Sequence, residues 1–282
     1  MAAKLQPGAV WVTRRRENPP PGRKHEERRE MRLFSNPVAP ATLALAMLAS
    51  PAAAQEWEFS VTPYLWAAGL EGDIGAFPNL PTAEVDLSFG DVLEELDGAI
   101  MVKAEAQRGR LGLIMDVGYV KTDSSTDDVT IRDPQFTGVT LKNELLTATL
   151  AGAWRAVDEA QYSIDFVGGV RFSKVSPDLA LTVRDTVVRR ANPDESWFDP
   201  VIGARTNVQL NPRWSLTAYG DVGGFGVSSD LTYQALATVG YAFNNRWALS
   251  AGWRHYAVDY EEDGFVYDVT QSGPILGVTF RW

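Results

Sequence analysis

The chain has 282 residues, of which 26 are basic and 36 acidic, and its formal net charge is −10. It contains no cysteine, which excludes disulfides, thiol catalysis and thiolate metal sites. An acidic chain lacks the basic surface that nucleic acids require, so no nucleic-acid partner is expected.

The first 54 residues are expected to lie outside the fold. Residues 31–54 have the form of a secretory signal peptide: a basic start, an apolar run of about 12 residues that is too short to span a membrane, and a small-residue cleavage site near Ala54. Residues 1–30 are polar and proline-rich, without apolar periodicity. Two interpretations of them are open, a misplaced gene start upstream of Met31 and a long disordered leader.

Residues 55–282 are predicted to form one all-β domain. The segment carries 17 basic and 32 acidic residues, because residues 1–54 hold 9 and 4 of the totals, and its net charge is −15. Apolar and polar residues alternate along it, as in strands whose two faces meet different surroundings. Ten strands of about 12 residues are expected, long enough to cross a bilayer at the usual tilt. They are 57–69, 97–108, 110–122, 139–155, 161–174, 197–210, 214–226, 231–243, 246–259 and 266–282.

The connections alternate between short and long. Tight turns are expected around Gly109 and at three later positions (157–160, 211–213 and 244–245), whereas long links cover 70–96, 123–138 and 175–196. This asymmetry is typical of an antiparallel, up-and-down transmembrane barrel with short periplasmic turns and long outer loops. Such barrels have an even strand count, so eight and twelve strands are the alternatives to ten.

The first long link contains two local signals. Asp91 followed by Glu94 predicts a helix N-terminus with Asp91 as its N-cap, and this helix is either a lid over the barrel or part of an ordered loop. The alternating stretch 84–89 is a candidate for an additional short strand.

Odd-numbered and even-numbered positions of each expected strand point to opposite faces, so the parity of a residue number assigns it to a face. One face is apolar, whereas the other carries charges of both signs in equal number, which is what a cross-linked barrel interior requires. The predicted lumen charge network comprises Glu58, Lys103, Glu105, Asp116, Arg155, Asp165, Arg171, Asp199, Arg205, Asp221, Arg254 and Arg281. Together with four aromatic residues on the same face, these charges are expected to fill most of the lumen and to exclude an open, porin-sized channel. A narrow path for small solutes is the other interpretation.

A soluble, lipocalin-like barrel would place the apolar face inside instead. Aromatic residues beside the tight turns favour the membrane barrel, because such a girdle sits at a membrane interface. The predicted girdle comprises Trp57, Trp154, Tyr162, Trp214, Phe243 and Trp247.

The last strand alternates to the end of the chain, with Phe280 and Trp282 on its apolar face and Arg281 on the other. Outer-membrane barrels close on a similar aromatic strand. We therefore predict that Phe280 and Trp282 form the signal that the barrel assembly machinery recognises.

Candidate chemistry is sparse. His255 is the single histidine of residues 55–282 and the only plausible catalytic base, but parity places it on the lipid-facing side. Lipid A deacylase barrels pair His with a Ser two residues on, where this chain has Ala257, and omptin proteases need an Asp where it has Trp253. We expect a rim histidine and no catalytic residues. Asp259, Glu261, Asp263 and Gly264 resemble the start of a calcium loop, but Thr270 replaces its final Glu, which favours a solvated hairpin. No cofactor and no metal site are predicted.

Three segments resemble a family of proteobacterial outer-membrane β-barrel proteins of the small, OmpA- or OmpW-like class. They are 63–75 (Pro-Tyr-Leu-Trp-Ala-Ala-Gly-Leu through Gly-Asp-Ile-Gly), 85–93 (Val-Asp-Leu-Ser-Phe through Asp-Val-Leu), and 267–277 with its Gly-Pro-Ile-Leu-Gly. Most members have no assigned activity, so the resemblance implies an outer-membrane location and a fold, but no catalytic residues.

The expected function is that of an integral outer-membrane barrel with a structural or narrow-pore role. Its partners are outer-membrane lipids, lipopolysaccharide and the assembly machinery; the sequence does not indicate an oligomeric state. A barrel enzyme acting on lipid A or peptides, and a surface-binding or adhesion protein using loops 70–96 and 175–196, are the alternatives.

Overall fold

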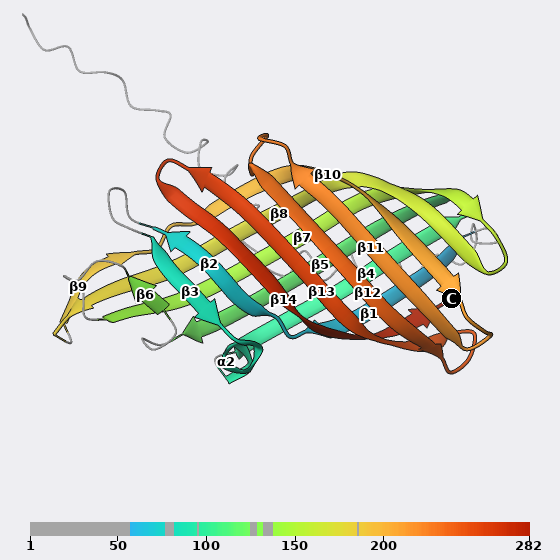
Figure 1. Ribbon diagram of the computed structural model, residues 1–282, viewed down its shortest axis with the longest axis horizontal. Coiled ribbons are helices and arrows are strands. Elements are labelled where there is room, and N and C mark those ends of the chain that lie inside the picture. The colour runs from blue at the N-terminus through green and yellow to red at the C-terminus, as the bar shows by residue number, and fades with distance from the viewer. Residues whose placement is uncertain (1–56, 77–81, 95, 125–128, 132–137, 185) are drawn as a thin grey trace, which may run out of the picture. The chain divides into compact units, whose positions relative to one another are not determined.

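The structure, a computed structural model, describes residues 57–76, 82–94, 96–124, 129–131, 138–184 and 186–282 (Figure 1). Ten of its strands form an antiparallel barrel, which β1 closes by pairing with β14. In barrel order these strands are β1 (Glu58–Trp66), β4 (Leu96–Arg108), β5 (Leu111–Ser124), β7 (Gly138–Asp158), β8 (Tyr162–Val183), β10 (Glu195–Gln209), β11 (Trp214–Gly224), β12 (Leu231–Ala242), β13 (Trp247–Glu262) and β14 (Phe265–Arg281). The predicted fold class and strand count are confirmed.

Tight connections gather at one end of the barrel, which we call the short-turn end. They are the turns β4–β5, β7–β8, β10–β11 and β12–β13, and the C-terminus lies at the same end in Figure 1. Asn211 and Asn244 stabilise two of these turns alike, because each side-chain oxygen accepts hydrogen bonds from the backbone N–H groups two and three residues later. We call the opposite end the far end.

At the far end the predicted long links are wrong in part, because much of their sequence forms strands. β2 (Gly69–Gly75) continues the direction of β1 and pairs with the far half of β14, and β3 (Ala83–Leu87) and β6 (Val129–Ile131) extend this sheet. The link expected at 175–196 is the far half of β8 together with β9 (Thr186–Ala191), a hairpin. These segments become strands because their alternating apolar residues have a common interior to pack into.

Gly273 allows the chain to pass from β1 to β2 alongside β14. A Cβ atom at this position would lie 1.9 Å from the carbonyl oxygen of Ala67, which is closer than any side chain tolerates. Ala67 lies between the end of β1 and the start of β2. Only glycine therefore permits this close approach of the two backbones.

The short helix α2 (Phe89–Glu94) starts earlier than predicted, and Asp91 is not its N-cap. Ser88 is the N-cap: its hydroxyl accepts the Asp91 N–H at 3.4 Å, while the Asp91 carboxylate accepts the Ser88 N–H at 2.8 Å. This reciprocal arrangement is a capping box, with Asp91 in the third helical position. The additional strand expected at 84–89 is present as β3.

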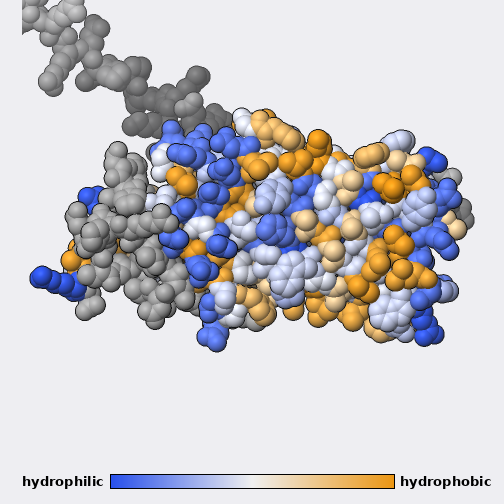
Figure 2. Space-filling view, in the orientation of Figure 1, coloured by the Kyte–Doolittle hydropathy of each residue, from blue (hydrophilic) through white to orange (hydrophobic). Residues whose placement is uncertain are grey.

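The two faces of the barrel exchange polarity along its length. Towards the short-turn end the exposed side chains are apolar, among them Leu65, Ile100, Leu150, Phe166 and Ile202. Towards the far end the interior is apolar instead, and we call its packed cluster the far-end core: Leu70, Ile74, Ala83, Val85, Leu87, Leu141, Leu145, Val175, Leu179, Leu181, Trp197, Tyr256, Val258, Tyr260, Phe265, Tyr267 and Val269. On the face shown in Figure 2, orange apolar side chains lie mainly over the half of the barrel nearer the C-terminus.

The predicted leader, 1–54, lies outside the described residues, as do 125–128 and 132–137 of the long link expected at 123–138. The boundaries at 30, 54 and 55 stay predictions. Among the described helices, none combines the length and the apolar character needed to cross a membrane.

We predict that charge is tolerated differently along the outer face. Phe166 lies on the short-turn half of β8 and Phe198 near the far end of β10; their side chains are 56% and 60% exposed, and each contacts an aromatic partner. If the apolar belt lies in lipid, Phe166→Arg should cost about 2–4 kcal/mol of unfolding free energy and Phe198→Arg about 0–1 kcal/mol.

Reversible urea unfolding in lipid vesicles, followed by heat-modifiable gel mobility, measures both losses. Equal losses in the two variants would contradict a membrane that surrounds only the short-turn half.

Candidate functional site

Nine of the twelve charges expected in the lumen form ion pairs, and the largest group spans four strands. Asp165 accepts from Arg155 Nε at 2.9 Å and from Arg205 Nη2 at 2.7 Å. Arg205 also pairs with Glu105, whose carboxylate lies 3.6 Å from Lys103 Nζ. Asp165 is almost completely buried, so its charge depends on these two guanidinium groups. These five residues form one connected charge cluster.

A second group surrounds Arg171, which is fully buried on β8. Its Nη2 atom donates to both carboxylate oxygens of Asp221 at 2.8 Å, and its Nη1 atom donates to Thr232 Oγ1 at 3.1 Å. Asp221 also accepts from Tyr219 OH at 2.6 Å and from Gln234 Nε2 at 2.9 Å. A buried pair is stable only when its remaining donors and acceptors are occupied, and these neighbours occupy them.

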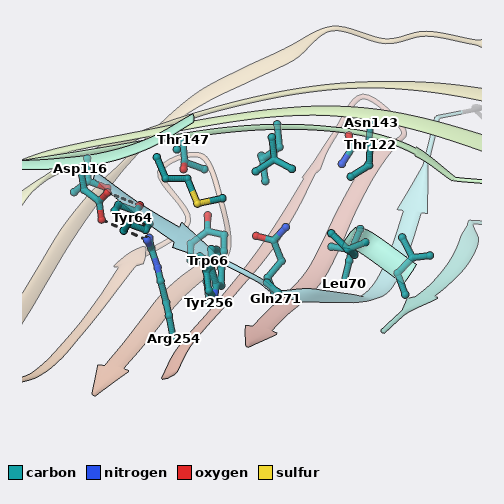
Figure 3. A pocket seen from close by; sticks show the side chains of 18 of the residues that line it. Tyr64, Trp66, Leu70, Asp116, Thr122, Asn143, Thr147, Arg254, Tyr256 and Gln271 are labelled. Carbon is teal, nitrogen blue, oxygen red and sulfur yellow. Dashed lines mark hydrogen bonds and ion pairs between the residues drawn. The ribbon is translucent and has the colours of Figure 1, made fainter. Parts of the chain in front are cut away.

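The third group connects β1, β5 and β13 (Figure 3). Arg254 Nη1 donates to Tyr64 OH at 2.9 Å and lies 3.4 Å from Asp116 Oδ2, while Tyr64 OH donates to Asp116 Oδ1 at 2.7 Å. The Arg254 guanidinium also lies over the Trp66 ring, 4.7 Å from its centroid. We call Tyr64, Asp116 and Arg254 the central triad.

Three predicted members of the network stand apart, which corrects the expectation of a single cross-linked set. Asp199 is fully buried but accepts hydrogen bonds from Trp197 Nε1 and from the backbone and hydroxyl of Ser229. It therefore anchors the β11–β12 connection. Glu58 and Arg281 are exposed at the short-turn end, and within the described part of the chain neither forms an ion pair.

Two cavities meet at the central triad. The larger, which we call the vestibule, measures about 460 Å³ and reaches the short-turn loops at Pro212 and Asn245. It is lined mainly by uncharged polar and charged side chains. The smaller, which we call the chamber, measures about 60 Å³ and lies between the triad and the far-end core. Tyr64, Asp116, Thr149 and Arg254 line both. The lumen is thus less completely filled near the short turns than expected, and beyond the chamber it is packed with apolar side chains.

The aromatic residues expected in the girdle lie beside the short turns. Trp154, Tyr162, Trp214, Phe243 and Trp247 are exposed, and Trp154 stacks on Phe166. The start of the described chain and its C-terminus join the same ring: Trp57 stacks on Phe59, Phe59 on Trp282, and Trp282 on Phe280. The residues predicted as the assembly signal therefore pack directly against the first strand.

His255 lies on the outward face of β13, where its Nε2 atom is 3.4 Å from Tyr233 OH. No carboxylate contacts its ring among the described residues. Asp263 and Gly264 both have positive φ, 50° and 86°, so the suspected calcium loop is a tight hairpin turn between β13 and β14. Burial, and then the Asp268 and Asp230 carboxylates, raise the pKa of Asp259 beside this turn. Within the described ranges no cluster of three metal-ligating side chains occurs.

The far-end core is the feature that parity reasoning missed. Tyr256, Val258 and Tyr260 follow Arg254 on the same inward face of β13, whereas the sequence predicts an inward face of charges with only four aromatic residues among them. The available signal was a change of polarity at constant parity: Arg254 is followed inward by aromatic and apolar residues, while Asp259 and Glu261 take over the outward face.

No protein-family model matches the chain, and no curated protein matches it. Among solved structures, the outer membrane protease OmpT from Escherichia coli is similar with a TM-score of 0.50 and 8% identity, over 82% of this chain and 98% of that one. A major outer membrane protein from Thermus thermophilus follows, with a TM-score of 0.41 and 14% identity over 80% and 99%. At such identities only the fold is comparable. The chain therefore has the fold of outer-membrane β-barrels, and the expected family stays a prediction.

We predict that the Arg171–Asp221 pair is required for stability. Arg171→Met would leave Asp221 charged and uncompensated in the interior, at a cost of about 3–5 kcal/mol in unfolding free energy. Lys174→Met is the matched control on the same strand, because Lys174 pairs with Asp194 at 3.0 Å in an exposed position and should contribute about 0–1 kcal/mol. Urea unfolding monitored by tryptophan fluorescence measures both. Similar losses in the two variants would refute the special role of the buried pair.

Proposed function

We propose that this protein is an integral outer-membrane barrel that is closed to free diffusion, with its short-turn end towards the periplasm and its far end outside the cell. Its role is structural: it spans the membrane with the short-turn half and presents a rigid β-structure beyond it. The vestibule admits small polar solutes from the periplasmic side to the central triad and no further. The observation that supports closure is that the central triad, the Arg171–Asp221 pair and the far-end core all lie inside the barrel.

The inversion of polarity supports membrane insertion over the soluble alternative. A lipocalin-like barrel keeps an apolar interior and a polar exterior along its length. Here the short-turn half has ion pairs inside and large apolar side chains exposed outside, such as Leu65 at 67% and Ile100 at 70%. An exposed apolar belt of this extent marks a surface that is covered by lipid.

The packing of the far-end core supports closure. Trp197 and Tyr260 stack with ring centroids 4.0 Å apart, and Phe265 and Tyr267 pack against them. A continuous path would require this aromatic cluster to separate and the buried ion pairs to break, each of which costs several kcal/mol. Thermal fluctuation does not supply that energy often enough for steady conduction.

A non-enzymatic role is part of the proposal. The His255 ring faces outward, and its described polar partner is the phenol of Tyr233, which supplies neither a nucleophile of the serine type nor a carboxylate that would orient a base. Outer-membrane lipids are the expected partners of the belt, and the barrel assembly machinery is the expected partner of Phe280 and Trp282.

We predict that the protein is recovered in the outer-membrane fraction and migrates faster on gels before heating than after it, because a closed barrel resists detergent. Recovery in the soluble periplasmic fraction would overturn the proposed location.

In planar bilayers the inserted barrel should be electrically silent over a wide voltage range. Gel mobility of protein re-extracted from the same membranes is the control, since silence has meaning only if folded barrels are present. Steady conductance steps from such membranes would refute closure.

A further inference from the structure

Two of the short turns are built alike and carry the same pair of functional side chains. Residues 211–214, Asn-Pro-Arg-Trp, join β10 to β11, and residues 244–247, Asn-Asn-Arg-Trp, join β12 to β13. In each turn the Asn side-chain oxygen accepts the backbone N–H groups of the Arg and of the Trp, at 2.8–3.0 Å. The turns are neighbours, because β11 pairs with β12. The same backbone geometry therefore presents an Arg followed by a girdle Trp twice.

The two arginines of these turns, Arg213 and Arg246, are available to a ligand. Both are exposed, and among the residues that the structure describes neither forms an ion pair with an acid. Arg213 Nη1 donates to Tyr241 OH at 3.3 Å, which leaves its other N–H donors free. Arg246 makes no side-chain hydrogen bond within the described part of the chain. Both guanidinium groups thus lack a counter-charge from the protein.

The tryptophans place these charges at the edge of the apolar belt. Trp214 and Trp247 are exposed; Trp214 packs edge-on against Tyr241 at 4.9 Å between ring centroids, and Trp247 packs against Phe280 at 4.8 Å. Interfacial Trp side chains lie at the level of lipid headgroups. Arg213 also reaches the rim of the vestibule, but its bond to Tyr241 keeps one guanidinium nitrogen at the girdle. An Arg one residue before such a Trp therefore lies near the lipid phosphates.

The other bases at this end are engaged elsewhere. The Arg108 guanidinium lies over the Trp57 ring, 5.9 Å from its centroid, and Arg110 Nη1 donates to the carbonyl oxygen of Ala156 at 3.4 Å. Arg281 is on the inward face of β14 and lines the vestibule. These contacts single out the two Asn-X-Arg-Trp turns.

The β7–β8 turn shows the contrast. It also lies beside a girdle residue, Trp154, but the turn itself carries Asp158 and Glu159. The nearby Arg155 is directed to Asp165 inside the barrel, 2.9 Å away. This turn offers no free guanidinium to the membrane surface.

We propose that Arg213 and Arg246 each bind the phosphate group of an anionic phospholipid in the leaflet that surrounds the short-turn end. A guanidinium presents several N–H donors in a planar fork that matches phosphate oxygens, and the adjacent Trp ring packs well at the glycerol level. An anionic lipid is favoured over a zwitterionic one, because a headgroup ammonium already neutralises the phosphate. The inference rests on the proposed membrane insertion and names the lipid that this part of the surface recognises.

The test is native mass spectrometry of the full barrel in detergent, mixed with equal amounts of phosphatidylglycerol and phosphatidylcholine. Two molecules of phosphatidylglycerol should be retained in preference to phosphatidylcholine, each with an affinity advantage of roughly fivefold, which is the contribution expected of one basic residue at an anionic membrane surface. The preference should shrink at high salt, because exposed charges are screened.

Three variants assign the sites. Arg213→Gln and Arg246→Gln each remove one guanidinium charge and should each leave one preferred phosphatidylglycerol, whereas the double variant should bind the two lipids equally. Arg189→Gln is the matched control, because Arg189 is an exposed base on β9 at the far end, away from the girdle. It should retain both preferred lipids.

Insertion into pure phosphatidylcholine vesicles, followed by heat-modifiable gel mobility, separates this inference from the proposed function. Failure of the unmodified protein to insert would overturn the proposed function. Normal insertion without a preference for phosphatidylglycerol would overturn only the lipid site. The site is also refuted if the double variant keeps the preference, or if Arg189→Gln loses it to the same extent.

Discussion

Every barrel strand has to satisfy two environments, and the side-chain alternation of β-structure forces both faces to change together. Near the short turns an apolar outer face requires the polar residues to point inward, where they are removed from bulk water and must pair. Beyond the level of Arg254 on β13 the outer face carries Asp259 and Glu261, and the inner face becomes apolar. The same ten strands therefore carry two arrangements. Near the short turns the apolar face points outward, as in membrane barrels, and near the far end it points inward, as in water-soluble proteins.

The lumen follows from this exchange. In the short-turn half, bulky inward side chains carry charge, and the register of the sheet brings acids and bases from different strands within hydrogen-bond distance, as in Arg155–Asp165–Arg205. In the far half, the same register brings Trp197, Tyr260 and Tyr267 together as a packed aromatic core. The two kinds of interior do not interpenetrate, and the chamber lies at their boundary. Arg254 and Asn143 are among the residues that line the chamber.

The sequence predicts which residues belong to the candidate site better than it predicts how they pair. Parity predicts that four charged residues point inward, because every second residue of a strand lies on the same face. They are Arg171, Asp221, Asp116 and Arg254. It does not say that Arg171 pairs with Asp221 across the intervening strand β10, or that Asp199 bonds Ser229 in place of a base. Those pairings depend on strand register and barrel curvature, which bring together residues distant in sequence. Likewise Ser88 replaced Asp91 as the N-cap of α2, since a capping box reads identically from either partner until the helix start is known.

The sequence by itself determined the class of fold: alternation in long strands, short turns at asparagine and glycine, and an aromatic final strand are local properties, and each is readable without distant contacts. It also determined that each strand has one apolar face and one face that carries charges, a pattern typical of membrane barrels. Only the tertiary structure decided that the supposed loops 70–96 and 175–196 contain β2, β3, the far half of β8 and β9, and that an apolar core packs inside the far end of the barrel. The physical reason is that burial is a property of the assembled barrel: Tyr256, Val258 and Tyr260 read as one more alternating stretch until nine other strands enclose them.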